Sequence, residues 1–107
     1  MERRHFCNFQ VAGFTYYDGP VVFHQLEIGS VVAMRFEPDN RFDPYAIALY
    51  FEGYKLGFVP RTCNHQLSKL LEMGYSNCLE ARIQSINSQE HPENQLHVIV
   101  YLLKSPV

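Results

Sequence analysis

Two short segments of the sequence place aromatic rings beside aspartates, a combination that can bind the bases of a single nucleic-acid strand. Tyr16 and Tyr17 are adjacent, and neighbouring side chains of an extended chain point to opposite sides, so both rings cannot enter one core. The outward ring either stacks on a base, a contact worth about 1–3 kcal/mol, or is an ordinary exposed tyrosine. Phe42, which precedes Asp43 in a polar stretch, has no evident core to join and can stack in the same way.

The polar stretch from residue 37 to residue 45 contains two prolines, two aspartates and an asparagine, and must be a loop. An aspartate before a proline often accepts a hydrogen bond from its own backbone, so Asp43 has a structural as well as a binding interpretation. Asn40 is interpreted as a residue that holds the loop. Glu37, Asp39 and Asp43 share this loop and can hold a divalent ion, but the pattern is weak and we predict no metal.

A run of basic side chains follows these segments along the chain. Its members are Lys55, Arg61, His65 and Lys69. Between Glu52 and Glu72 there are three Lys/Arg and no acidic residue, a local excess of +3. The run can track phosphates with help from backbone N–H groups at a helix start, or it can be the solvated start of that helix.

The composition limits the classes of protein to which the chain can belong. Its 107 residues fit a single domain spanning 1–107, and a 47% hydrophobic content argues against disorder. No apolar run approaches the length of a membrane span, and no apolar signal region follows the first residues. The 9 Lys+Arg against 11 Asp+Glu, a net charge of -2, argue at first against a nucleic-acid partner. Because of the local excess of +3, the net charge no longer excludes DNA as a partner. It argues only against binding that contacts many phosphates, such as binding along a duplex.

The cysteines indicate the compartment. Cys7, Cys63 and Cys78 are an odd number at wide spacings, with no CxxC pair, so no disulfide framework is predicted. A reducing cytoplasm or nucleus is the expected location, with the cysteines acting as small buried hydrophobes. Cys63 and His65 lie close together but lack a second ligand pair at zinc spacing. We therefore predict no structural zinc and no cofactor.

The periodicity of apolar residues is mostly two, which predicts a mainly β fold. Strands are expected around residues 7–11, 32–36, 46–51, 54–59, 79–84 and 96–103, with a short helical turn possible within 21–28. Glu52 and Gly53 form a two-residue hairpin turn. Six short strands joined by turns predict a small OB-like or SH3-like barrel, closed or partly open.

One segment reads as a helix. Cys63, Leu67 and the pair Leu70–Leu71 fall at helical spacing. Thr62 or Asn64 is expected to cap its start, and Gly74 to end it in a left-handed conformation. The apolar stripe of this helix needs a partner, so the helix is expected to plug one end of the barrel or cover one edge.

Several of these segments in their order resemble the HIRAN domain family, which occurs alone in bacteria and at the N-terminus of fork-remodelling Swi/Snf-type helicases. They are the string GFTYYDGP at residues 13–20, the Glu-Pro-x-Asn-x-x-Asp-x-x-Ala-Ile run at 37–47, and LGFVPR at 56–61 with the helix after it. The run at 37–47 is the most specific. The resemblance covers about residues 7–103 and implies an OB-like or SH3-like barrel that binds DNA, in the best-understood members at the 3′ end of a single strand.

The resemblance also implies roles for individual residues. The family's match to Asp43 contacts the free 3′-hydroxyl; a carboxylate accepts that hydrogen bond and repels a phosphate placed there. The match to Arg61 is a basic residue near the DNA backbone. Thr15 stands where the helicase-linked members have an arginine before the paired tyrosines, so one charged phosphate contact is missing.

The sequence therefore predicts a non-catalytic module that captures single-stranded DNA 3′ ends for repair or fork processing. A helicase or nuclease acting in trans would supply the chemistry, because no catalytic motif stands out. The alternatives are an SH3-like protein-interaction module and an RNA-binding domain. The expected location is cytoplasmic, at the nucleoid if the protein is bacterial, with no membrane partner. The predicted binding residues are Tyr16, Tyr17, Phe42, Asp43, Arg61, Thr15, Lys55, His65 and Lys69.

Overall fold

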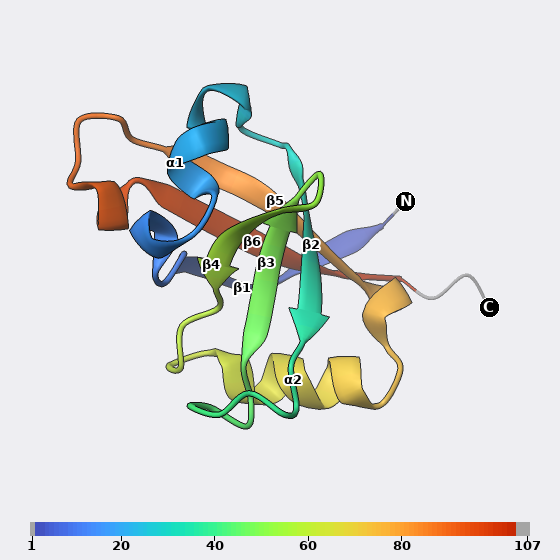
Figure 1. Cartoon of the computed structure of the whole chain (residues 1–107). Coiled ribbons are helices and arrows are strands. Elements are labelled where there is room, and N and C mark those ends of the chain that lie inside the picture. The colour runs from blue at the N-terminus through green and yellow to red at the C-terminus, as the bar shows by residue number, and fades with distance from the viewer. Residues whose placement is uncertain (1, 105–107) are drawn as a thin grey trace.

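The computed structural model describes residues 2–104 as one antiparallel sheet with a helix at one end (Figure 1). The strands are β1 (Arg3–Gln10), β2 (Val31–Phe36), β3 (Ile47–Phe51), β4 (Tyr54–Phe58), β5 (Leu79–Ile86) and β6 (Leu96–Leu103), in the spatial order β1-β6-β5-β2-β3-β4. The helical elements are η1 (Phe14–Tyr16), α1 (Gly19–Val22), η2 (Phe23–Gln25), α2 (Asn64–Glu72), η3 (Ser76–Cys78) and η4 (Pro92–Asn94). The predicted mainly β fold, with six strands, one main helix and a short helical turn, is confirmed.

The core lies between the two halves of the curved sheet. Alternate residues of β6 are buried, and Val98 and Val100 lie opposite Ile83 and Ala81 of β5. β3 is buried on both faces, as its continuous apolar run predicts, and Leu49 has no exposed surface. Burial of these branched side chains away from water is the main stabilising term of the fold.

The β3–β4 hairpin has the predicted two-residue turn. Glu52 and Gly53 both have a positive φ, of 47° and 86°, which is the type I′ geometry that matches the right-handed twist of paired strands. This turn makes β4 antiparallel to β3, with Phe51 opposite Tyr54. β4 is thereby placed at the outer edge of the sheet.

The sheet does not close into a full barrel, and one isolated bridge joins its two edges. Ala12, just after β1, exchanges two backbone hydrogen bonds with Phe58 of β4, each 2.9 Å long. Gly57 permits this approach: its φ is 143°, and a Cβ atom there would lie 2.4 Å from the carbonyl oxygen of Ala12. Of the two expectations, a closed and a partly open barrel, the structure adopts the second.

The helix α2 lies across one end of the sheet, below β2 and β3 in Figure 1. It buries Leu67 completely and ends as predicted: Gly74 has φ 89°, and Tyr75 N–H donates to the carbonyl of Leu70 in a Schellman arrangement. The helix begins where expected, but the predicted cap by Thr62 or Asn64 was wrong. The N-cap residue is Cys63, and no side chain caps the helix, because Asn64 turns inward to another partner described below.

All three cysteines are free and partly buried, and Cys7 and Cys63 pack against the core. Burial, together with the nearby Cys63 thiol, raises the pKa of Cys7 from the usual 9.0 to about 11. Burial also raises the pKa of Cys63, against a smaller lowering by the Thr62 hydroxyl. These thiols therefore behave as the small apolar side chains that the sequence predicts. No helix in the described part of the chain has the length and apolar character to cross a bilayer.

Replacing Gly57 with alanine tests the bridge between the sheet edges. We expect Gly57→Ala to lower the free energy of unfolding by about 3 kcal/mol, because the new Cβ meets backbone that cannot move aside. Gly53→Ala is the matched control: its φ is also positive, but a Cβ there meets nothing within 4 Å, so about 1 kcal/mol is expected. Urea denaturation followed by circular dichroism measures both. Equal losses would show that the approach of Ala12 does not constrain the fold.

The raised pKa of Cys7 predicts slow alkylation. At pH 8 the native thiol should react with iodoacetamide at least tenfold more slowly than in the urea-unfolded chain, because a pKa about two units higher leaves about a hundredfold less thiolate. The native rate should still be rising at pH 10, where that of the unfolded chain has levelled off. Peptide mapping by mass spectrometry reads out Cys7. Equal native and unfolded rates at pH 8 would contradict the burial.

Candidate functional site

A pocket of about 250 Å³ lies where the loop between β2 and β3 faces the bridge between the sheet edges. It is lined by Ala12, Tyr17, Asn40, Phe42, Asp43, Ala46, Phe58, Val59 and Arg61. Four of the nine predicted binding residues therefore meet in one place: Tyr17, Phe42, Asp43 and Arg61. They come from three separate segments of the chain, which only the folded sheet brings together.

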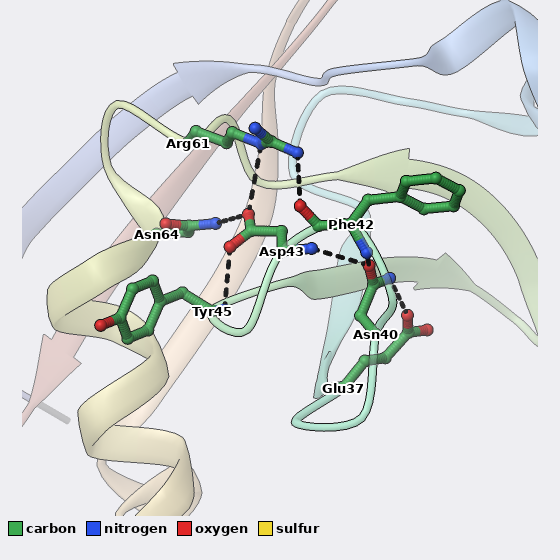
Figure 2. Close-up of polar contacts among 7 residues, drawn as sticks. All are labelled: Glu37, Asn40, Phe42, Asp43, Tyr45, Arg61 and Asn64. Carbon is green, nitrogen blue, oxygen red and sulfur yellow. Dashed lines mark hydrogen bonds and ion pairs between the residues drawn. The ribbon is translucent and has the colours of Figure 1, made fainter.

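Asn40 holds the β2–β3 loop in shape, as predicted. Its side-chain oxygen accepts the backbone N–H groups of Phe42 and Asp43, at 2.9 and 3.1 Å, and its amide nitrogen donates to Glu37 at 3.0 Å. Figure 2 shows this amide between Glu37 and the turn that carries Phe42. The loop is thus built from its own side chains, which is how a polar segment keeps one conformation without a core.

Asp43 is the most heavily bonded side chain of the site (Figure 2). Its Oδ1 accepts the backbone N–H of Tyr45 at 2.9 Å, which is the predicted turn interaction. Its Oδ2 accepts the side-chain amide of Asn64 at 2.8 Å and lies 3.6 Å from Nε of Arg61. With 15% of its side chain exposed, the carboxylate is mostly buried yet lines the pocket.

Arg61 contacts the β2–β3 loop at Phe42 and Asp43. One of its terminal nitrogens donates to the carbonyl oxygen of Phe42 at 2.7 Å, while Nε faces Asp43. The side chain is 72% exposed, so its guanidinium keeps donors that can reach a phosphate.

The aromatic residues divide into packed and exposed rings. Tyr17 packs edge-on against Phe58, with ring centroids 5.6 Å apart, whereas Phe42 is 83% exposed and Tyr16 is 81% exposed. Tyr16 does not line the pocket, although it directly precedes Tyr17. The expectation for the tyrosine pair is met in part: Tyr16 points outward, whereas Tyr17 packs on Phe58 but remains 38% exposed.

The positive charge of the basic run is smaller than its residue count indicates. Lys55 lies over the rings of Tyr17 and Phe58, and its Nζ is 3.5 Å from a carboxylate oxygen of Glu37. Arg61 faces Asp43 in the same way. Two acidic side chains of the β2–β3 loop therefore offset two of the three charges behind the expected excess of +3.

Five predicted residues do not line the pocket: Tyr16 and Lys55, described above, and Thr15, His65 and Lys69. The backbone N–H of Thr15 donates to a carboxylate oxygen of Glu93 at 2.6 Å, which ties the tyrosine turn to the loop before β6. His65 places its ring 4.3 Å from the ring of Tyr45. The side chain of Lys69, in the last turn of α2, makes no hydrogen bond or ion pair within the described range 2–104.

Four residues that contact the predicted ones were not themselves predicted as binding residues: Glu37, Asn64, Phe58 and Glu93. The spacing of Glu37 and Asn40 is a signal that could have revealed the first. Asn64 was interpreted as a helix cap, because its position before an apolar stripe is the usual signal for one. Glu93 is 78 residues from Thr15, and no local pattern reports such a contact.

Metal-ion chemistry has no cluster to support it in the part of the chain that the structure describes. Within residues 2–104, no group of three or more His, Cys, Asp or Glu side chains converges. Glu37 and Asp43 share the loop, but each binds amide and cationic donors instead. The pocket offers a partly free carboxylate, a guanidinium and aromatic rings, which suit a ligand with a hydroxyl, a phosphate and a planar ring.

Comparison with known proteins identifies the family and supports the fold. The sequence model of the HIRAN domain family matches residues 5–102. A crystal structure of a protein from Lactobacillus plantarum superposes with a TM-score of 0.79 at 21% identity, covering 97% of this chain and 98% of that one. The HIRAN domain of human HLTF superposes with a TM-score of 0.61 at 18% identity, covering 95% of this chain and 81% of that one. No curated protein sequence matches the chain. Since the family match spans all six strands and α2, the chain belongs to the HIRAN domain family.

Proposed function

We propose that this chain is a non-catalytic module that binds the 3′ end of single-stranded DNA in the pocket between the β2–β3 loop and the sheet edge. HIRAN domains are known as a DNA-binding family. The observation that carries the finer proposal is the position of Asp43, a carboxylate that lines the pocket and retains acceptor capacity. It stands at the position that the resemblance to the family assigns to contact with the 3′-hydroxyl.

The hydrogen bonds of Asp43 leave room for a ligand. A carboxylate offers about four lone-pair sites, and one on each oxygen is used, by Tyr45 and by Asn64. A terminal hydroxyl can donate to a remaining site in a charge-assisted bond. A phosphate at the same position would bring negative charge against the carboxylate, so the pocket favours a free end over a blocked or continuing strand.

The exposed groups around the pocket suit the adjoining nucleotides. Phe42 presents an aromatic face, on which any base can stack, and Arg61 has donors for a backbone phosphate. Because Lys55 and Arg61 already face acidic partners, we infer a footprint of few phosphates and a modest affinity. A helicase or nuclease acting in trans would then use the captured end. The three free cysteines favour a reducing compartment such as the cytoplasm.

An SH3-like protein-interaction module is the second candidate, and the offset positive charge is what favours it. Exposed rings such as Tyr16 and Phe42 are also the groups that bind extended peptides. The two functions differ in salt dependence, because nucleic-acid binding releases condensed counterions when the complex forms and is therefore weakened steeply by added salt. RNA is the third candidate, because stacking accepts either backbone.

End recognition is tested with one oligonucleotide in two forms. Fluorescence anisotropy should show a single strand with a 3′-hydroxyl binding at least about tenfold more tightly than the same strand with a 3′-phosphate, because of repulsion by Asp43. In Asp43→Asn the ratio of the affinities for the 3′-hydroxyl and 3′-phosphate strands should fall to near one, because the negative charge is removed. The thermal midpoint of this variant is measured in parallel, since Asp43 also holds the loop. Equal wild-type affinities for the two forms would overturn end recognition.

Stacking is tested by removing single exposed rings. Phe42→Ala and Tyr16→Ala should each weaken binding of single-stranded DNA about tenfold, the loss of one stacked base, without loss of stability. Tyr75→Ala is the matched control, because Tyr75 is 54% exposed but lies beyond the end of α2. Repeating the titrations at 50 and 200 mM salt separates nucleic-acid from peptide-type binding. Unchanged affinity in both variants would exclude these rings from the interface.

A further inference from the structure

We propose that Asn64 is a positioning residue, which aims the carboxylate of Asp43 at the strand end while leaving its charge intact. This inference rests on the proposed function and extends it to a residue that does not touch the ligand. Asn64 is the first residue of α2, is only 2% exposed, and does not line the pocket. Its effect on binding must therefore pass through the side chain it contacts.

The contact holds the carboxylate from a second direction. The backbone N–H of Tyr45, within the loop, donates a hydrogen bond to Oδ1, and the side-chain amide of Asn64, in the helix, donates one to Oδ2 at 2.8 Å. Figure 2 shows Asn64 reaching from α2 to the loop. A carboxylate bonded through both oxygens cannot rotate about its terminal bond without losing one of them, so the direction of its remaining lone pairs is set.

The chemical nature of the donor matters as much as its position. Oδ2 lies 3.6 Å from Nε of Arg61, which is longer than a hydrogen bond. The neutral amide donates to Oδ2 instead, so Arg61 stays at ion-pair distance from the carboxylate without a hydrogen bond to it. If the amide is removed, the exposed guanidinium of Arg61 can approach Oδ2, and the repulsion of a 3′-phosphate weakens.

The burial of Asn64 agrees with a specific role for its amide. A buried amide without a partner costs free energy, and an apolar residue at a helix start would avoid that cost. Asn64 and Ser68 are the two buried polar residues of α2, and both are 2% exposed. The hydroxyl of Ser68 donates to the carbonyl of His65 within the helix, so Ser68 provides a matched control without contact to Asp43.

The first test compares Asn64→Ala with Ser68→Ala. Both variants lose a buried hydrogen bond, so both should be less stable than the wild type. Only Asn64→Ala should lower the ratio of affinities for 3′-hydroxyl and 3′-phosphate strands, by about tenfold, which is the lower range for losing a hydrogen bond to a charged group. Ser68→Ala should keep the wild-type ratio even if its absolute affinity falls.

The second test uses Asn64→Asp, which keeps the shape of the side chain but donates a hydrogen bond only when protonated. Its affinity for the 3′-hydroxyl strand should be low at pH 8, where two carboxylates face each other and that of Asp43 is turned away, and should recover toward pH 5.5, where the pair can share a proton. Arg61 faces the same carboxylate and His65 packs on Tyr45, and the 3′-phosphate itself titrates near pH 6. The wild type and Asn64→Ala, measured over the same pH range, account for these groups.

A third measurement needs no variant. The side-chain amide resonance of Asn64 in the ¹⁵N-labelled wild type should shift at saturation with the 3′-hydroxyl strand, and less with the 3′-phosphate strand. A resonance unmoved at saturation, or a wild-type ratio that survives in Asn64→Ala, would overturn the role of Asn64 alone. A wild-type ratio near one would overturn end recognition itself and the role of Asn64 with it.

Discussion

The carboxylate of Asp43 joins the loop that carries Phe42 to the helix that follows β4. Its two oxygens are bonded to Tyr45 in the loop and to Asn64 in α2, and Arg61 faces it from the segment between them. These segments belong to different parts of the fold, so the shape of the pocket depends on this group. Because the side chain is mostly buried, its bonds are stronger than they would be in water, and leaving them unmade would be correspondingly costly.

The opposite wall of the pocket depends on a close approach of two backbones. The bridge between Ala12 and Phe58 brings the end of β1 to the outer edge of β4, and Gly57 provides the space for it. Phe58 then presents its ring to Tyr17, and Tyr17 in turn lines the pocket. The pocket therefore lies at the incompletely closed edge of the sheet, where polar and aromatic side chains line it.

The positive charge of the site is reduced because its cationic side chains are paired with acidic ones. Lys55 and Arg61 each face an acidic residue of the β2–β3 loop, Glu37 and Asp43 respectively. Paired cations on a surface still attract phosphates, but less strongly than free ones, and salt screens what remains. A net charge of -2 and a site with offset cations are consistent with each other. Both are consistent with the proposed binding of a strand end, at which few phosphates would be contacted.

Much of the fold was predictable from sequence because its causes are local. Alternating apolar residues predicted the strands, and Glu52 and Gly53 predicted the hairpin turn. Asn40 was predicted to hold its loop, and its side chain does accept hydrogen bonds from the backbone of that loop. The run at 37–47 carried the family resemblance, and the family is confirmed over residues 5–102. Each of these signals lies within about a dozen residues, a range over which backbone preference and side-chain spacing determine conformation.

The tertiary structure alone decided which groups meet. Asn64 contacts Asp43 across 21 residues and Glu93 holds Thr15 across 78, and nothing in the local pattern distinguishes these partners from other polar side chains. The pairing that offsets the charge of Lys55 was hidden for the same reason. Hydrogen bonds and ion pairs act over a few ångströms of space, so their partners are determined only when the sheet brings distant segments together.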